Sequence, residues 1–171
     1  MRTQFVDCRW ELGAPERGRE LYLAGHIPGA SFLDLDEDLS DLSVPGQGRH
    51  PLPSAERFAA VAARAGIGPD VLVVAYGSLG GAERLWWLLR HFGHDDCGVL
   101  IGGLDVWGGP LRSGEETIEP AEFVPREGEG DTIGPEEIAR RLGDRSLVLV
   151  DARSAHRWRG EPNEIDDPAG R

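Results

Sequence analysis

The sequence predicts an α/β fold with a parallel central sheet. Two short runs, "DVLVVAY" at 70–76 and "CGVLIGG" at 97–103, have the near-continuous apolar character of strands that are buried on both faces. A loop and an amphipathic helical segment separate the two runs. Buried strands that alternate with helices are typical of a parallel sheet with helices on both faces.

The N-terminal third supplies two further strands and a long loop. The stretch "TQFVDC" at 3–8 predicts a buried strand that leads into a loop, and "SFLDL" at 31–35 predicts a shorter strand. Between them, residues 11–30 have the pattern of a loop, one short helical turn and a second loop. Residues 38–53 are rich in Gly, Pro and Ser, which predicts another loop.

Two amphipathic segments predict the main helices. The first begins after Ser54, a residue type favoured at helix N-caps, and ends at Gly66. The second follows the loop 77–81 and ends at Gly93. The side chains expected to face the core are Phe58, Val61, Ala62, Leu85, Leu88, Leu89 and Phe92.

Changes in composition divide the chain into three parts. Residues 1–112 hold the strand and helix pattern and form one predicted domain. Residues 113–131 contain many Glu, Gly and Pro with little periodicity, which predicts an interdomain linker. Residues 132–171 begin a second predicted domain, with a short helix at 134–144 and a strand in "SLVLVDARS" at 146–154.

A short internal repeat relates the two predicted domains. "FVDCRW" at 5–10 and "LVDARS" at 149–154 share an apolar residue, Val, Asp, any residue and Arg. In the first copy "GHIPGA" follows, beginning at Gly25, and Gly170 and Arg171 lie at nearly the same distance in the second copy. We therefore expect the second domain to be an incomplete copy of the first, without its later strand, loop and helix.

Charge and cysteine content exclude several classes of function. The chain has 171 residues and a net charge of −12, which argues against nucleic acid and anionic membranes as partners, because both require a basic footprint. The first ten residues lack the apolar stretch of a signal peptide, so the cytoplasm is the expected compartment. Cys8 and Cys97 are not spaced like metal ligands or a disulfide framework, and we expect neither a metal ion nor another cofactor.

Several ordered motifs resemble one family. "YLAGHIPGASFL" at 22–33 is similar to the rhodanese signature, and "VDCRW", "GRHPLP", "YGSLGGAERLWWLLRHFGH" and "IGGLDVW" resemble the N-terminal domain of tandem-rhodanese sulfurtransferases. "VLVDARSAHRWRGEPNEIDDPAGR" resembles the opening of their C-terminal domain. The resemblance implies a rhodanese-like fold followed by the start of a second, catalytic-type copy.

The resemblance also implies a chemistry. In this family a Cys of the C-terminal domain takes sulfane sulfur from thiosulfate or 3-mercaptopyruvate, forms a persulfide and passes the sulfur to a thiol or cyanide. The implied partners are thus a small anionic sulfur donor and a thiol acceptor. Tandem members keep the fold of the N-terminal domain but have lost its Cys. We therefore expect a sulfurtransferase whose catalytic Cys lies beyond Arg171, and no sulfur transfer by these 171 residues alone.

The loop after strand 70–76 fits a domain that has lost its nucleophile. The family's Cys would stand directly after Tyr76, where this chain has Gly77, which has no side chain that could attack. Ser78 could serve as a nucleophile in principle, but no base is identifiable nearby, and a loop or helix-cap role is favoured. The degenerate loop is expected to comprise Gly77, Ser78, Leu79, Gly80 and Gly81.

Arg157 is the expected substrate-binding residue. It lies six residues after Asp151, and in the family an Arg at that spacing holds the anionic donor. A guanidinium suits this role because its planar fork binds oxyanions bidentately. The alternative is a solvated surface Arg, which we favour for the 171-residue chain on its own. Asp151 and Arg153 are expected to form a local ion pair.

Other polar and aromatic residues have structural interpretations. His26 is expected to shape its loop through hydrogen bonds, and Cys8 and Cys97 are expected to be structural. At most one of the adjacent Trp86 and Trp87 can face the core fully. Arg49 and His50 could form an anion patch or a loop ion pair with an Asp.

Two other functions fit parts of the sequence. The first is a catalytically inactive rhodanese-like module that binds a partner or an anion, which Gly77 supports. The second, a related phosphatase, is set aside because its loop also requires a Cys. An unfinished sheet would expose the strand in 146–154, so we expect 132–171 to dock on the first domain, to pair with a partner chain that completes the repeat, or to be mobile.

Overall fold

The computed structural model of the chain describes residues 1–78, 80–126, 128 and 130–161 and divides into two compact units, Met1–Asp131 and Thr132–Arg171. Leu79, and the residues Gly170 and Arg171 that align with the start of the first copy's loop, lie outside the described residues.

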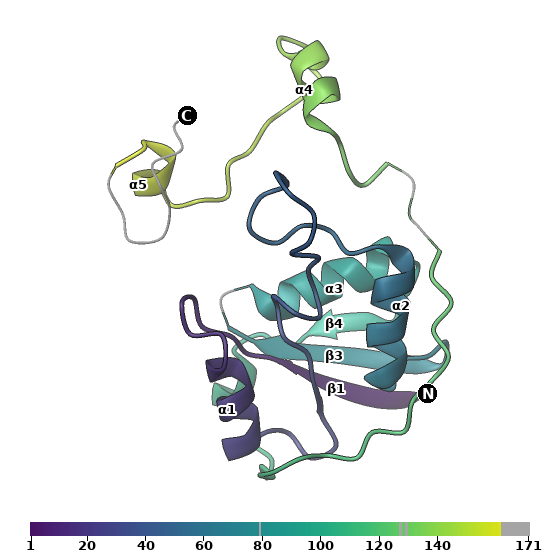
Figure 1. Cartoon of the computed structure of the whole chain (residues 1–171). Coiled ribbons are helices and arrows are strands. Elements are labelled where there is room, and N and C mark those ends of the chain that lie inside the picture. The colour runs from purple at the N-terminus through teal and green to yellow at the C-terminus, as the bar shows by residue number, and fades with distance from the viewer. Residues whose placement is uncertain (79, 127, 129, 162–171) are drawn as a thin grey trace. The chain divides into compact units, whose positions relative to one another are not determined.

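The first unit is built on a parallel sheet, as the apolar runs predict. The strands β1 (Arg2–Cys8), β2 (Ser31–Phe32), β3 (Val71–Gly77) and β4 (Cys97–Val99) lie in the order β2-β1-β3-β4, and every pair is parallel (Figure 1). In this register Cys8 pairs with Gly77, so β1 and β3 end side by side at the same edge of the sheet.

Helices cover both faces of the sheet. The α2 helix (Ala55–Arg64) and the α3 helix (Gly81–His91) pack on the face that carries Val6, Val73 and Ala75. The α1 helix (Arg17–Ala24) and the short η1 helix (Gly103–Asp105) lie on the other side of the sheet (Figure 1). That face is filled by a second cluster of Ile27, Ala30, Phe5, Tyr76 and Trp107.

The two main helices form where their periodicity predicts them. The Ser54 hydroxyl caps α2 by accepting a hydrogen bond of 3.2 Å from the Arg57 backbone N–H. Gly66 and Gly93, just beyond α2 and α3, adopt φ angles of 77° and 83°, a left-handed conformation that glycine adopts at helix ends. All the side chains expected to face the core are buried: Phe58, Val61, Ala62, Leu85, Leu88, Leu89 and Phe92.

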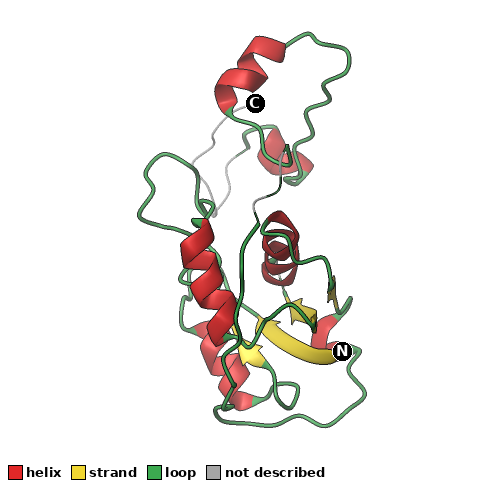
Figure 2. Cartoon of the chain, turned by 90° about the vertical axis from the view of Figure 1, so that its right-hand side faces the viewer, coloured by secondary structure: helices red, strands yellow, loops and turns green. Residues whose placement is uncertain are grey.

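Much of the segment expected to link two domains, residues 113–131, packs along the first unit. We call residues 112–126 the strap (Figure 2, loop colour). The Ala121 N–H donates to the Ala63 carbonyl oxygen at 2.9 Å, and the Phe123 ring packs edge-on against Phe58 with ring centroids 5.6 Å apart. The composition correctly indicates an absence of helices and strands, but single apolar residues such as Phe123 are enough to hold the strap on the core.

The second unit contains two short helices, α4 (Pro135–Arg141) and α5 (Ala155–Trp158). The expected strand at 146–154 is wrong: residues 147–153 lack regular structure, and Val148 and Val150 are 77% and 81% exposed. A strand requires a hydrogen-bonded neighbour, and no described residue pairs with this segment.

No helix in the described part of the chain combines the length and apolar character that a membrane crossing requires.

Candidate functional site

The strand order marks one edge of the sheet in the first unit as a candidate binding site. The chain leaves β1 to form β2 on one side and later returns to form β3 on the other side. In open α/β sheets, ligands bind at the carboxyl ends of the strands, at the point where the order reverses. Here that point lies between Cys8 and Gly77 and is bordered by Trp10, Ser78 and the start of α3.

The position that the family resemblance assigns to the nucleophile has no room for a side chain. A Cβ atom added to Gly77 would lie 2.7 Å from the Cys8 carbonyl oxygen, and one added to Gly81 would overlap the same oxygen. Because the obstacle is backbone, a side chain at either glycine would force β1 or the loop to move. The end of β1 therefore occupies the place of a side chain in this loop.

The remaining described residues of the loop offer no nucleophile with a base. The Ser78 hydroxyl donates a long hydrogen bond of 3.5 Å to the Trp10 carbonyl oxygen, and the Ser78 carbonyl oxygen accepts from the Gly81 N–H at 3.3 Å. Gly80 has a φ of 92°, the left-handed conformation that lets the chain turn into α3. These contacts give Ser78 a loop-shaping role; Leu79 lies outside the described residues.

Asp7 and Arg9 form a buried ion pair at the end of β1. The Arg9 Nε lies 3.0 Å from each carboxylate oxygen of Asp7, whose side chain is fully buried. The Arg9 Nη2 also donates to the Leu21 and Gly25 carbonyl oxygens at 3.0 and 2.7 Å. Arg9 therefore ties the carboxyl end of β1 to the last turn of α1. Both residues belong to the repeat motif, which is the signal in the sequence that marks them.

The second unit repeats this geometry. The Arg153 Nε lies 3.0 and 2.9 Å from the two carboxylate oxygens of Asp151, and the Arg153 backbone N–H donates to Asp151 Oδ1 at 2.9 Å. Hydrogen bonds from Arg153 lower the pKa of Asp151 to about 2. The expected local ion pair of Asp151 and Arg153 is thus present, with the same bonds as in the first copy of the repeat.

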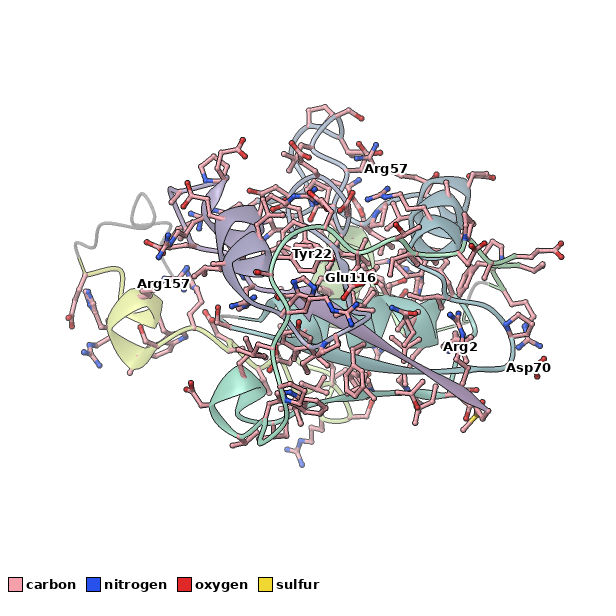
Figure 3. All side chains as sticks on the ribbon, turned by 90° about the horizontal axis from the view of Figure 1, so that it is seen from below. Arg2, Tyr22, Arg57, Asp70, Glu116 and Arg157 are labelled. Atoms are coloured by element: carbon pink, nitrogen blue, oxygen red, sulfur yellow. The ribbon has the colours of Figure 1, made fainter. Side chains whose placement is uncertain are left out.

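Arg157 lies on α5, in the first turn after its cap (Figure 3). The Ser154 hydroxyl accepts a hydrogen bond of 3.5 Å from the Arg157 backbone N–H. The positive charge of Arg157 contributes, after Arg153, to the lowered pKa of Asp151. Arg157 therefore lies within electrostatic reach of Asp151, while its role toward a donor stays a prediction.

His26 has the structural role expected from "GHIPGA". It is fully buried, its Nδ1 lies 2.8 Å from the Tyr22 carbonyl oxygen, and its ring stacks on Tyr22 with centroids 4.1 Å apart. Its Nε2 lies 3.3 Å from Glu116 Oε1, and the same carboxylate oxygen accepts from the Gly29 N–H at 2.8 Å. Glu116 thus joins the strap to this loop (Figure 3). Glu116 carries no signal in the sequence, because it lies in the aperiodic segment.

Neither cysteine has the environment of a reactive thiol. Cys8 is fully buried, and burial raises the pKa of its thiol well above the ordinary value. Cys97 is half-buried, and burial raises the pKa of its thiol to about 11. Thiolates, not thiols, attack sulfur, so these environments favour the structural role expected for both residues.

The adjacent Trp86 and Trp87 differ in burial, and His50 lies beside an Asp. Trp87 packs partly against the core and stacks on His91 with centroids 4.8 Å apart, whereas Trp86 is the more exposed and lies under the Arg90 guanidinium. His50 Nε2 lies 3.0 Å from Asp36 Oδ1, which favours the loop ion pair over the anion patch for His50. Among the described residues, no group of three or more His, Cys, Asp or Glu is placed to hold a metal ion.

Comparison with known proteins points to one family. A family model described as "Rhodanese-like domain" matches residues 1–109. The chain is 37% identical to a protein named "Putative thiosulfate sulfurtransferase SseB" of Mycobacterium tuberculosis, over 98% of this chain and 61% of that protein. It is 39% identical to "Probable 3-mercaptopyruvate sulfurtransferase" of Pseudomonas aeruginosa, over 96% of this chain and 61% of that protein.

Solved structures agree with these relatives. The crystal structure of SseA from Escherichia coli, described as a 3-mercaptopyruvate sulfotransferase, has a TM-score of 0.83 at 30% identity and covers 98% of this chain and 67% of its own. The 3-mercaptopyruvate sulfurtransferase of Leishmania major has a TM-score of 0.77 at 28% identity, over 92% of this chain and 44% of its own. The chain spans about three fifths of the length of the first curated relatives that it matches.

Proposed function

This chain belongs to the rhodanese-like domain family, and on that basis we propose that it is part of a sulfurtransferase. The proposed reaction moves sulfane sulfur from thiosulfate or 3-mercaptopyruvate to a thiol or to cyanide. The observation that carries the proposal is the match of 94% to 98% of this chain to relatives that bear the names of these two activities.

The proposed reaction proceeds through a persulfide on a Cys outside these 171 residues. The thiolate of that Cys attacks the outer sulfur of thiosulfate, the S–S bond of the donor breaks, and sulfite leaves with the bonding electron pair. A thiol or cyanide then takes the outer sulfur and releases the Cys thiolate. Cys8 and Cys97 are unsuited to this task because burial raises the pKa of both thiols.

The first unit supplies scaffold in this proposal. The overlap between a Cβ at Gly77 and the Cys8 carbonyl oxygen supports this role, since the loop could not take up a Cys without moving β1. The buried Asp7–Arg9 pair gives that scaffold a rigid edge.

The second unit supplies the donor-binding side chain in this proposal. Arg157 binds the anionic end of the donor, and the Asp151–Arg153 pair orients the segment from which α5 starts.

Two chains test the proposal: the 171-residue chain, and a longer one extended through the second repeat. Both receive thiosulfate or 3-mercaptopyruvate with cyanide as acceptor, and thiocyanate is measured. We expect turnover from the longer chain and none from the shorter one. In the longer chain Arg157→Gln should raise KM for the donor about tenfold or more, because a charged hydrogen bond is lost. Arg145→Gln serves as the matched control. Absence of turnover in the longer chain with either donor would contradict the proposal.

A second candidate function is a catalytically inactive module that binds a partner protein or an anion. Gly77 favours it, because glycine stands where the family resemblance places the nucleophilic Cys and has no side chain that could attack. The crowding of the same loop by the Cys8 carbonyl oxygen counts against an anion there. This second function would be favoured if the longer chain showed no turnover and bound a partner in a saturable way.

A further inference from the structure

A cavity of about 580 Å³ opens in the first unit, far from the loop at Gly77. Its walls come from the turn between α3 and β4, from the far end of the strap, and from Pro69 before β3. These are the amino ends of the parallel strands, and β3 separates them from the carboxyl edge by roughly 20 Å, the length of a seven-residue strand. The volume lies within the range of about 300–1,000 Å³ typical of small-molecule sites.

The cavity wall contains a buried polar group without a partner. His94 is only 7% exposed, and its Nε2 is shielded from solvent with no hydrogen-bond partner among the described residues. An unpaired buried polar group destabilises a protein, so a ligand that hydrogen-bonds to Nε2 would be favoured by satisfying it. The ring of Phe123 lies beside the imidazole, with centroids 6.1 Å apart, and forms a half-buried apolar wall of the cavity.

The charged side chains that line the cavity determine whether it favours a cation or an anion. Asp95, Asp96 and Glu122 place three carboxylates around the cavity, against the single guanidinium of Arg126. That guanidinium already donates to the Gly93 carbonyl oxygen at 3.0 Å, and Asp95 lies 3.7 Å from Arg90 outside the lining. The excess of carboxylates favours a cation, while Phe123 and Pro69 offer it an apolar surface.

We propose that this cavity binds a small organic cation that combines a flat apolar body with an amidinium, guanidinium or ammonium head. The body lies against Phe123, and the head reaches the carboxylates and His94 Nε2, which accepts a hydrogen bond from it. Because the cavity lies at the opposite edge of the sheet from the loop at Gly77, this proposal does not depend on the sulfurtransferase proposal.

Benzamidine is the probe, and neutral benzamide is its matched control of the same shape. Each is titrated into the isotopically labelled 171-residue chain, and backbone amide resonances are followed by NMR. We expect saturable shifts centred on residues 93–96 and 122–126, with benzamidine at least about tenfold tighter than benzamide. Equal affinity for the two probes, no saturation, or shifts spread evenly over the acidic surface would overturn the proposal.

Variants of the protein distinguish specific binding of benzamidine in the cavity from nonspecific attraction of a cation to an acidic surface. His94→Phe should weaken benzamidine binding about tenfold while leaving thermal stability unchanged or higher, since it replaces an unpaired polar group by an apolar ring. Asp96→Asn should also weaken binding and keeps the test valid if His94→Phe fails to fold. Asp70→Asn, on the exposed neighbouring residue labelled in Figure 3, should leave binding unchanged. Full affinity in both His94→Phe and Asp96→Asn would contradict the assignment.

Discussion

At the scale of single residues, Gly77 shows how closely the end of one strand can approach the loop that follows its neighbour. Its Cα approaches the end of β1 so closely that a Cβ would lie 2.7 Å from the Cys8 carbonyl oxygen. The sequence identifies Gly77 as a position without a nucleophile. It does not reveal the steric closure, because closure depends on where β1 ends in space.

Gly77→Ala is therefore expected to destabilise the first unit by about 1–3 kcal/mol, the usual cost of forcing extra atoms into a packed site. Urea unfolding followed by tryptophan fluorescence measures this change. Gly98→Ala is the matched control, since Gly98 also lies in a strand and a Cβ there would meet nothing within 4 Å. Equal stability of the two variants would show that the loop can relax around a side chain.

Glu116 gives a second prediction at this scale. Hydrogen bonds from the Gly29 N–H and His26, and the charge of Arg112, lower the pKa of its carboxyl group. A group whose pKa is lowered by folding stabilises the fold above its unfolded pKa and loses that contribution as the pH falls through the folded value.

Glu116→Gln should thus lower the free energy of unfolding at pH 7 by about 1 kcal/mol, and the difference from the parent protein should shrink on acidification below pH ~4. Denaturant unfolding at a series of pH values measures both effects. Glu119→Gln, on an exposed strap residue, is the control and should change little. A deficit for Glu116→Gln that stays constant down to low pH would mean that the carboxylate charge is not responsible.

At the scale of elements, periodicity predicts α2 and α3 well and fails for the strap. In the structure, the regularly spaced apolar residues of each helix are buried, and Ser54 caps the N-terminus of α2 as expected. The strap shows no hydrophobic periodicity, because isolated side chains and backbone hydrogen bonds hold it on the first unit. One such bond runs from the Arg126 N–H to the Phe92 carbonyl oxygen at 2.9 Å. Nothing in a list of residue types distinguishes such a segment from a free linker.

The strap's hold on the core can be tested at Phe123. Phe123→Ala should destabilise the first unit by about 2 kcal/mol, because the ring packs against Phe58 and the main core cluster. Val124→Ala is the neighbouring control: Val124 is 70% exposed, and its truncation should cost less than about 0.5 kcal/mol. Thermal or urea unfolding of the two variants provides the comparison, and equal losses would mean that the strap does not contribute through Phe123.

At the scale of the whole chain, the internal repeat is the strongest signal that the sequence carries. The shared Asp-x-Arg motif predicts related geometry, and both copies form the same bidentate pair and the same bond from the Arg backbone N–H to the Asp carboxylate. Their surroundings differ, because Asp7 is buried within a paired strand whereas Asp151 follows residues 148–150, which no described residue pairs. Local motifs are thus predictable from sequence, but the formation of a strand depends on its neighbours.

In the proposed sulfurtransferase, the first unit supplies scaffold and neither Cys8 nor Cys97 carries the transferred sulfur. Intact-mass spectrometry of the 171-residue chain after incubation with thiosulfate or 3-mercaptopyruvate tests it most directly, with trapping of any persulfide by an alkylating reagent and peptide mapping of Cys8 and Cys97. We expect no gain of sulfur at either cysteine, because burial keeps both thiols protonated. Transferable sulfur on either one, with matching thiocyanate formation from cyanide, would contradict the account.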